Sequence, residues 1–139
     1  MKKILFAILM TAAFISCKKK TPESECGNIV CTEQFVSLYI KFVDNKGAGT
    51  EVKDFSVVNQ RTGDKKYPTI TGYLTVERGT YIFADDGNTK SLSEEGDDLK
   101  ITATSVATNQ TKSVIVKVKG GKCACHIEKV SGPEQVAFD

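Results

Sequence analysis

The chain has 139 residues, with 19 Lys and Arg against 17 Asp and Glu, and 40% of its residues are hydrophobic. This length is enough for one domain with a single core. The nearly balanced charge, without a basic stripe or interleaved aromatic residues, excludes charge-driven binding of nucleic acid.

The first residues, MKKILFAILMTAAFISC, have the three parts of a secretion signal. Two lysines form a positive n-region, residues 4–15 form an apolar run with one interruption, and the small Ser16 stands before Cys17. The apolar run of about 12 residues is too short to cross a bilayer as a helix, which needs about 20. We therefore expect residues 1–16 to be a lipoprotein signal peptide and not a transmembrane anchor.

The stretch FISC at Cys17 resembles a bacterial lipobox, in which the cysteine is lipidated and becomes the new N-terminus. Phe14 replaces the usual Leu, and looser lipoboxes of this kind resemble those of Bacteroidota lipoproteins. The resemblance implies palmitate-type acylation at Cys17 and anchoring in the cell outer membrane, where several acyl chains hold a protein almost permanently. In such lipoproteins, surface export goes with acidic residues after the cysteine, so the lysines at 18–20 favour the periplasmic face. The alternative is an ordinary signal peptide with a chance cysteine.

The mature chain would keep 123 of the 139 residues, and its 17 basic residues would balance its 17 acidic ones. We expect residues 17–33 to be a lipidated tether with a disulfide segment. Residues 34–131 are expected to form the folded domain, and residues 132–139 a C-terminal tail.

The folded part shows apolar residues with a period of two, which is typical of antiparallel strands with one buried face. In EQFVSLYIKFV, for example, one face carries Val36, Leu38, Ile40 and Phe42. β-branched and aromatic residues dominate such runs, and short Gly- and Asn-containing connections separate them. We expect seven strands, at about 34–43, 52–60, 71–77, 80–85, 98–107, 111–119 and 122–130. The fold class is therefore all-β, a single antiparallel, immunoglobulin-like β-sandwich.

Three motifs give a more specific resemblance: DNKG at 44–47, GYLTV at 72–76 and GTY at 79–81. In this order, over about residues 34–119, they resemble the transthyretin-like or carboxypeptidase-regulatory-like sandwiches. The usual T-D-x-x-G before the mid-domain strand is missing, and the cysteine-rich ends are additional. The resemblance implies a fold only, because such a sandwich carries no activity by itself.

With Cys17 assigned to lipid, four cysteines remain, and an even number in an exported domain predicts two disulfides. A bond from Cys123 to Cys125 is disfavoured, because residues two apart in a strand lie about 6.5–7 Å apart, against the about 5.5–6 Å of a disulfide. The other two pairings each tie Cys26 and Cys31 to the last strand. If the segments are antiparallel, Cys26 pairs with Cys125 and Cys31 with Cys123. We expect this arrangement, and the parallel one stays open.

A metal-binding or thiol-redox site is the alternative use of these residues, since Cys26, Cys31, Cys123, Cys125 and His126 include enough soft ligands for Zn²⁺ or Cu⁺. An oxidising compartment favours disulfides instead, and the cysteine spacings fit zinc sites poorly. Strand alternation would also turn His126 away from the sulfurs. We therefore expect no cofactor and a half-exposed strand histidine.

The connection at 84–98 is acidic and has enough oxygen ligands for Ca²⁺, but it lacks the D-x-[DN]-x-[DN]-G pattern of a calcium loop. A solvated loop is the expected reading. Its oxygen-bearing residues are Asp85, Asp86, Asn88, Glu94, Glu95, Asp97 and Asp98.

A catalytic role is not expected, because one histidine and scattered carboxylates define no triad and no Gly-rich phosphate loop follows a strand. The sequence favours a non-catalytic binding, assembly or structural module of the cell envelope. Its expected partners are the membrane, through the lipid, and an envelope protein or a saccharide. Exposed aromatic candidates for saccharide contact are Phe35, Tyr39 and Tyr73.

Overall fold

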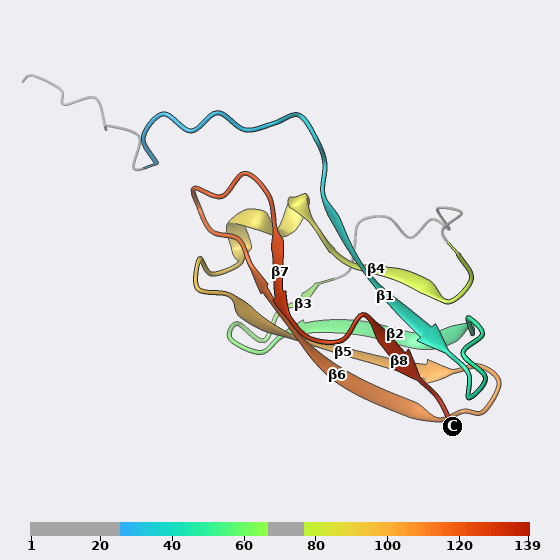
Figure 1. The fold of residues 1–139 in the computed structure, drawn as a ribbon. Helices are drawn as coiled ribbons and strands as arrows, with labels where there is room; N and C mark the ends of the chain where they lie inside the picture. The colour runs from blue at the N-terminus through green and yellow to red at the C-terminus, as the bar shows by residue number, and fades with distance from the viewer. Residues whose placement is uncertain (1–25, 67–76) are drawn as a thin grey trace, which may run out of the picture.

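The structure, a computed structural model, describes residues 26–66 and 77–139. It confirms an all-β sandwich with short connections and one 3-10 helix (Figure 1). The strands are β1 Ser37–Val43, β2 Val52–Asn59, β3 Lys65–Lys66, β4 Thr80–Asp85, β5 Asp97–Ser105, β6 Thr111–Lys119, β7 Glu128–Ser131 and β8 Gln135–Ala137, and the helix is η1 Asp86–Ser91. The strand predicted at 71–77 falls almost wholly outside the described residues. No helix within 26–66 or 77–139 has the length and apolar character needed to cross a membrane.

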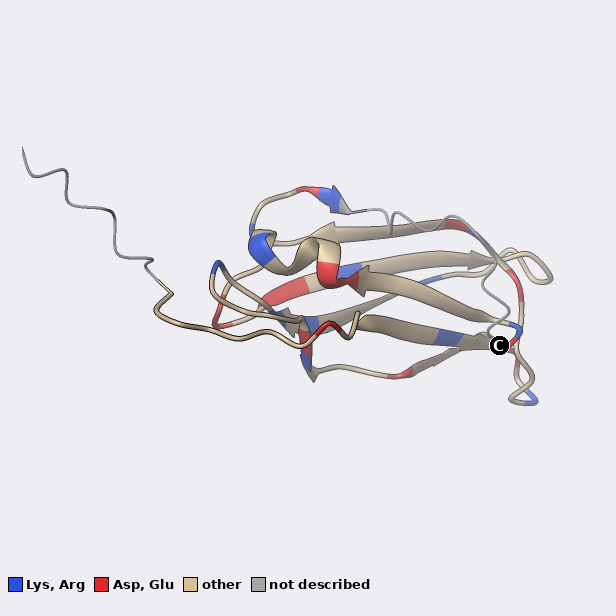
Figure 2. Ribbon diagram, turned by 90° about the horizontal axis from the view of Figure 1, so that it is seen from above, with Lys and Arg blue, Asp and Glu red and all other residues tan. Residues whose placement is uncertain are grey.

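The strands form two sheets that share one core. The smaller sheet has the order β4-β1-β8, and the larger has the order β3-β2-β5-β6-β7. Among the strands of the described residues, every pairing is antiparallel except that of β1 with β8, which is parallel. Figure 2, seen from above, shows the strands running lengthwise between two ends of the domain. The N-terminal segment meets one of these ends.

The period-two pattern places the core as the sequence predicted. Ile40 and Phe42 of β1 are buried against Ile101 of β5 and Val116 and Val118 of β6, so residues from both sheets fill one cluster. The pairing of β1 with β4 shifts register between residues 38 and 39. The predicted apolar face is therefore buried fully only beyond this irregularity.

The end of the chain belongs to the core, which corrects the expected tail at 132–139. β8 pairs with β1 in register from Lys41↔Gln135 onward, and the Phe138 amide donates to the Val43 carbonyl at 2.8 Å. Phe138 is only 2% exposed and stacks on Phe42 with ring centroids 5.9 Å apart. A short apolar alternation therefore suffices to add a third strand to the smaller sheet.

Candidate functional site

Two disulfides join the N-terminal segment to the segment before β7. They connect Cys26 with Cys123 and Cys31 with Cys125, with Cα atoms 5.2 and 5.3 Å apart and sequence separations of 97 and 94 residues. The structure thus confirms that two bonds tie the N-terminal segment to the residues just before β7. The expected pairing of Cys26 with Cys125 and Cys31 with Cys123 was wrong. We call these two bonds the disulfide clamp.

The pairing differs because neither cysteine segment is a strand. The strand predicted at 122–130 begins only at Glu128, and the residues before it form turns and bends. The expected pairing assumed two antiparallel, hydrogen-bonded strands. In the structure, the first cysteine of one segment, Cys26, bonds the first cysteine of the other, Cys123. The second cysteines, Cys31 and Cys125, bond each other in the same way. The two segments therefore run in the same direction where the disulfides join them.

Two glycines hold the second cysteine segment against η1. The amide of Gly120 donates to the Ser93 carbonyl at 3.1 Å, and the amide of Gly121 donates to the Thr89 carbonyl at 2.8 Å. A Cβ atom on Gly120 would lie 2.5 Å from the Thr89 oxygen, and Gly121 has a φ of +117°, which favours glycine. The GG pair thus allows the close approach that places the cysteines beside η1.

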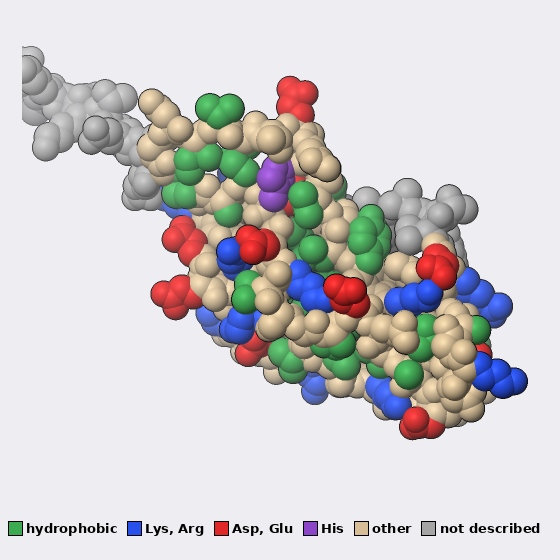
Figure 3. Space-filling view, viewed as in Figure 1, with side chains coloured by type: hydrophobic (Ala, Val, Ile, Leu, Met, Phe, Trp, Pro, Cys, Tyr) green, Lys and Arg blue, Asp and Glu red, His purple; other side chains and the backbone are tan. Residues whose placement is uncertain are grey.

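His126 lies between the two joined segments and does not sit on a strand. Its Nδ1 is 2.7 Å from Asp86 Oδ2, and its Nε2 is 2.8 Å from Thr32 Oγ1. Thr32 and His126 each follow a cysteine of the same disulfide, so the hydrogen bond lies next to the covalent one. The histidine side chain is 27% exposed and shows in purple below the N-terminal segment in Figure 3.

Asp86 connects three parts of the chain at this point. Its carboxylate accepts hydrogen bonds from the Val36 amide at 2.8 Å and the Ile127 amide at 3.0 Å, besides its contact with His126. Burial raises the pKa of Asp86, but these hydrogen bonds outweigh that effect and hold the pKa below its ordinary value. Asp86 is therefore an ionised anchor for the start of β1 and for the segment before β7.

Sequence reasoning missed this carboxylate–imidazole–hydroxyl chain, because Thr32 and Asp86 are 94 and 40 residues away from His126. The order of groups is that of a hydrolytic triad. Such a triad also needs a substrate cleft and donors for a developing oxyanion. The groove described below includes none of the three residues in its lining. The hydrogen bonds of His126 to Thr32 and Asp86 add a non-covalent link beside the clamp.

Replacing Asp86 with alanine is expected to lower the free energy of unfolding by about 2–3 kcal/mol at pH 7, because three donors lose one charged acceptor. The folded-state pKa of Asp86 is depressed, so its contribution is present above its ordinary pKa of 3.8 and is lost as the pH falls through the folded value. Chemical denaturation at pH 7 and at acidic pH measures both effects. The exposed Glu95→Ala is the control and is expected to change stability by less than about 0.5 kcal/mol. A gap between wild type and Asp86→Ala that widens in acid would contradict this account.

The acidic residues of 84–98 have separate partners instead of forming one cluster. Asp85 caps η1 by accepting from the Gly87 amide, and Asp98 pairs with Lys117 at 3.1 Å. Among the residues that the structure describes, no group of three or more His, Cys, Asp or Glu side chains is placed to hold a metal ion. The four cysteines proposed as zinc or copper ligands are joined in disulfides.

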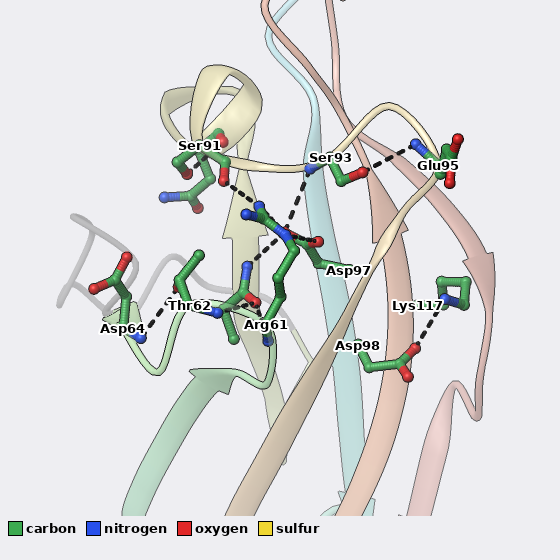
Figure 4. A network of polar contacts seen from close by, with 11 residues as sticks. Arg61, Thr62, Asp64, Ser91, Ser93, Glu95, Asp97, Asp98 and Lys117 are labelled. Atoms are coloured by element: carbon green, nitrogen blue, oxygen red, sulfur yellow. Dashed lines mark hydrogen bonds and ion pairs between the residues drawn. The ribbon is translucent and has the colours of Figure 1, made fainter.

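Asp97 is the most deeply buried of these acids, and it is the acceptor at the centre of a hydrogen-bond network (Figure 4). Its side chain is 1% exposed and accepts a forked pair of bonds from Arg61, Nε at 2.6 Å and Nη2 at 2.7 Å, and a third bond from Asn59. Arg61 also donates to the Ser91 carbonyl at 3.2 Å. The Arg61 guanidinium holds the pKa of Asp97 below its ordinary value although burial opposes this. The network fastens the β2–β3 turn to the start of β5 and to the end of η1.

Asp97→Asn is expected to lower the free energy of unfolding by about 2–3 kcal/mol, since the half-exposed Arg61 loses a charged, two-point acceptor. The neighbouring Asp98→Asn is the matched control. Its side chain is 50% exposed, so its ion pair contributes about 0–1 kcal/mol. Urea denaturation of both variants at neutral pH compares the two residues. Equal losses would contradict the role assigned to the buried carboxylate.

A groove of about 470 Å³ lies on the outer face of the smaller sheet, and none of the four clamp cysteines lines it. Tyr39 and Lys41 of β1 lie along it, and Lys41 pairs with the exposed Glu77 at 2.6 Å. In Figure 3, hydrophobic, basic and acidic side chains alternate over this face. Of the three aromatic candidates, Tyr39 lines the groove, Phe35 does not, and Tyr73 lies outside the described residues. The lining residues are Ser37, Leu38, Tyr39, Lys41, Thr80, Lys129, Glu134 and Gln135.

No family model matches the chain, and no curated protein or solved structure is significantly similar to it. The clamp and the groove are therefore interpreted from their own geometry and chemistry.

Proposed function

We propose that the protein is a lipid-anchored, non-catalytic β-sandwich lipoprotein of the cell envelope. The observation that carries this proposal is the disulfide clamp, which fastens the residues that follow the tether to the segment before β7. Disulfides persist in oxidising compartments. The signal sequence proposed at residues 1–16 would export the protein to such a compartment. The clamp thus agrees with the lipidation inferred for Cys17.

The position of the clamp has a mechanical consequence for a protein held by its N-terminus. Only eight residues separate Cys17 from Cys26, so a force on the anchor reaches the domain at Cys26. The bond to Cys123 passes that force into the segment held by η1, and β1 is not peeled from its sheet. This arrangement supports a structural or binding module that works on a membrane.

The finer parts of the proposal rest on the sequence. The lysines at 18–20 support the periplasmic face of the outer membrane, as in Bacteroidota-type lipoproteins. The proposed relation to transthyretin-like domains rests on the motifs at 44–47 and 79–81, and the motif at 72–76 lies outside the described residues. A sandwich of this kind needs no active site to serve as a scaffold.

Metabolic labelling with radioactive palmitate tests the anchor. The precursor expressed in a bacterium is expected to take up label and to sediment with membranes, and Cys17→Ser is expected to abolish the labelling. Ser16→Ala is a matched control, since a small residue remains before the cysteine. An unlabelled wild-type protein, or label that persists in Cys17→Ser, would overturn the proposal.

A second candidate function, saccharide binding, is favoured by the exposed Tyr39 in a groove with hydroxyl, amide and charged groups. An aromatic face with a few polar groups is a common lining for small-ligand sites. Titration with oligomers of N-acetylglucosamine or glucose, followed by NMR amide shifts, is expected to perturb β1 and β8. Tyr39→Ala should remove the shifts and Phe35→Ala should keep them. Shifts that ignore Tyr39→Ala would rule out the groove.

A further inference from the structure

The N-terminal segment turns large apolar side chains toward solvent. Val30 is 93% exposed, Phe35 is 61% exposed and Ile29 is 48% exposed. Exposed apolar residues gathered in one short segment point to an interaction surface more than single ones do. We call these three residues the apolar segment.

The disulfide clamp keeps Ile29 and Val30 outside the core. Both residues lie between Cys26 and Cys31, and each of those cysteines is bonded to the segment before β7. Thr32, just beyond, is held by His126. A flexible leader could cover its apolar residues by folding back, but a segment fixed at both ends cannot do so freely. The chain thus presents these residues at a fixed place.

That place is at one end of the sandwich. Figures 1 and 2 both show the N-terminal segment at the end opposite to the turn between β5 and β6. That turn carries Val106, which is 50% exposed. The molecule therefore has exposed apolar residues at both ends, but only the first end adjoins the proposed anchor.

We propose that the apolar segment is a membrane-docking surface, which inserts into the boundary between the lipid head groups and the acyl chains. The inference rests on the proposed lipidation of Cys17. The nine steps from Cys17 to Cys26 span at most about 30 Å when extended and about 17 Å as a flexible coil. Ile29 and Val30 therefore stay within reach of the bilayer for as long as the lipid is inserted.

Charges of both signs lie near this end, since Lys122 precedes Cys123 and lysines at 18–20 follow the anchor, so net charge does not explain docking and apolar insertion is expected to dominate. Glu33 is an exposed member of the same stretch, and Glu94 lies against Gly121 in the turn before the second cysteine segment. These carboxylates offset part of the attraction that the lysines would have for negative head groups. Docking is therefore expected on neutral phosphatidylcholine and to change less than about twofold between low and high salt.

A single tryptophan tests the proposal, because the chain has none. Val30→Trp in the lipidated mature protein, on phosphatidylcholine vesicles, is expected to emit at shorter wavelength. Lipids brominated high on the acyl chain should quench it more than lipids brominated near the chain end. Val106→Trp, at the opposite end, is the matched control and is expected to stay unquenched. Both sites are exposed, and thiol titration checks that the clamp has formed.

The outcomes separate the docking surface from the anchor. A lipidated Val30→Trp protein that is not quenched overturns docking while the anchor stands. A protein without acyl mass overturns the proposed function. Vesicle binding by the Cys17→Ser form then still measures the apolar segment without a lipid anchor. In that form, Ile29→Ser with Val30→Ser is expected to weaken vesicle binding at least about tenfold. A blue shift that depends on protein concentration and not on bromine would mean that a second copy covers the segment, which contradicts membrane docking.

Discussion

Removing both disulfides is expected to lower the free energy of unfolding by about 7 kcal/mol, whereas removing either one alone is expected to cost about 2 kcal/mol. A bond between Cys26 and Cys123 spans 97 residues, and the chain-entropy treatment assigns about 4–5 kcal/mol to such a loop. Once that bond is present, the bond between Cys31 and Cys125 closes a ring of only about 7 residues and adds about 2 kcal/mol. Either bond alone closes the large loop. Removing the first disulfide therefore costs little stability, and removing the second costs much more.

Guanidinium denaturation of three alanine variants measures this asymmetry: one for each disulfide and one for both. The total loss is comparable to the stability of an ordinary small domain, about 5–15 kcal/mol, so the variant without either bond is expected to be marginal or unfolded. Dithiothreitol on the wild type supplies an independent route to the same state. Two equal losses of about 4–5 kcal/mol for the single removals would contradict the shared loop.

Phe138→Ala is expected to lower the free energy of unfolding by about 3–5 kcal/mol, which is typical of a buried phenylalanine. The side chain is 2% exposed and stacks on Phe42, which also meets Tyr81 with ring centroids 5.7 Å apart. The loss combines the transfer of an aromatic ring into water with a cavity between the two sheets. It also removes the anchor that keeps β8 on β1.

Phe35→Ala is the matched control for this prediction, because it truncates the same residue type at a site that is 61% exposed. It is expected to change the stability of the protein in solution by less than about 0.5 kcal/mol. Urea denaturation with a fluorescence or circular dichroism signal compares the two variants. A Phe138→Ala loss as small as that of Phe35→Ala would mean that residues 132–139 are a tail after all.

The sequence predicts most of the core because a strand with one buried face shows apolar residues at every second position. The alternation in β1 identified Ile40 and Phe42 as members of one face, and both are buried in the core. β8 escaped prediction because three residues after a Gly-Pro pair are too few to show a period. Its parallel pairing with β1 depends on where the chain returns in space, which no local pattern records.

The clamp was predictable in its residues but not in its pairing. Cysteine number and compartment identify two bonds, whereas the pairing depends on the path of two irregular segments. The contact of His126 with Thr32 follows once Cys31 is known to bond Cys125, because each residue is the next along the chain. Asp86 needs the fold itself, since β4 and η1 bring it to this end.

The short helix η1 left a signal that could have been used. Asp85 caps the helix and Asn88 reaches back to the Asp85 amide at 3.2 Å. This reciprocal arrangement is a variant of the capping box, which places a capping side chain three residues before its polar partner. The acidic composition of 84–98 suggested a solvated loop, and the spacing within it pointed to a helix start.

Mass spectrometry of the native protein extracted from membranes tests the central claim most directly, because it reports the lipid and the disulfide map together. No Lys or Arg separates Cys26 from Cys31 or Cys123 from Cys125, so partial reduction with stepwise alkylation is needed to resolve the two bonds. The account predicts a mature chain that begins at an acylated Cys17, with Cys26 bonded to Cys123 and Cys31 bonded to Cys125. An unacylated Cys17, or free thiols at the other four cysteines, would contradict it.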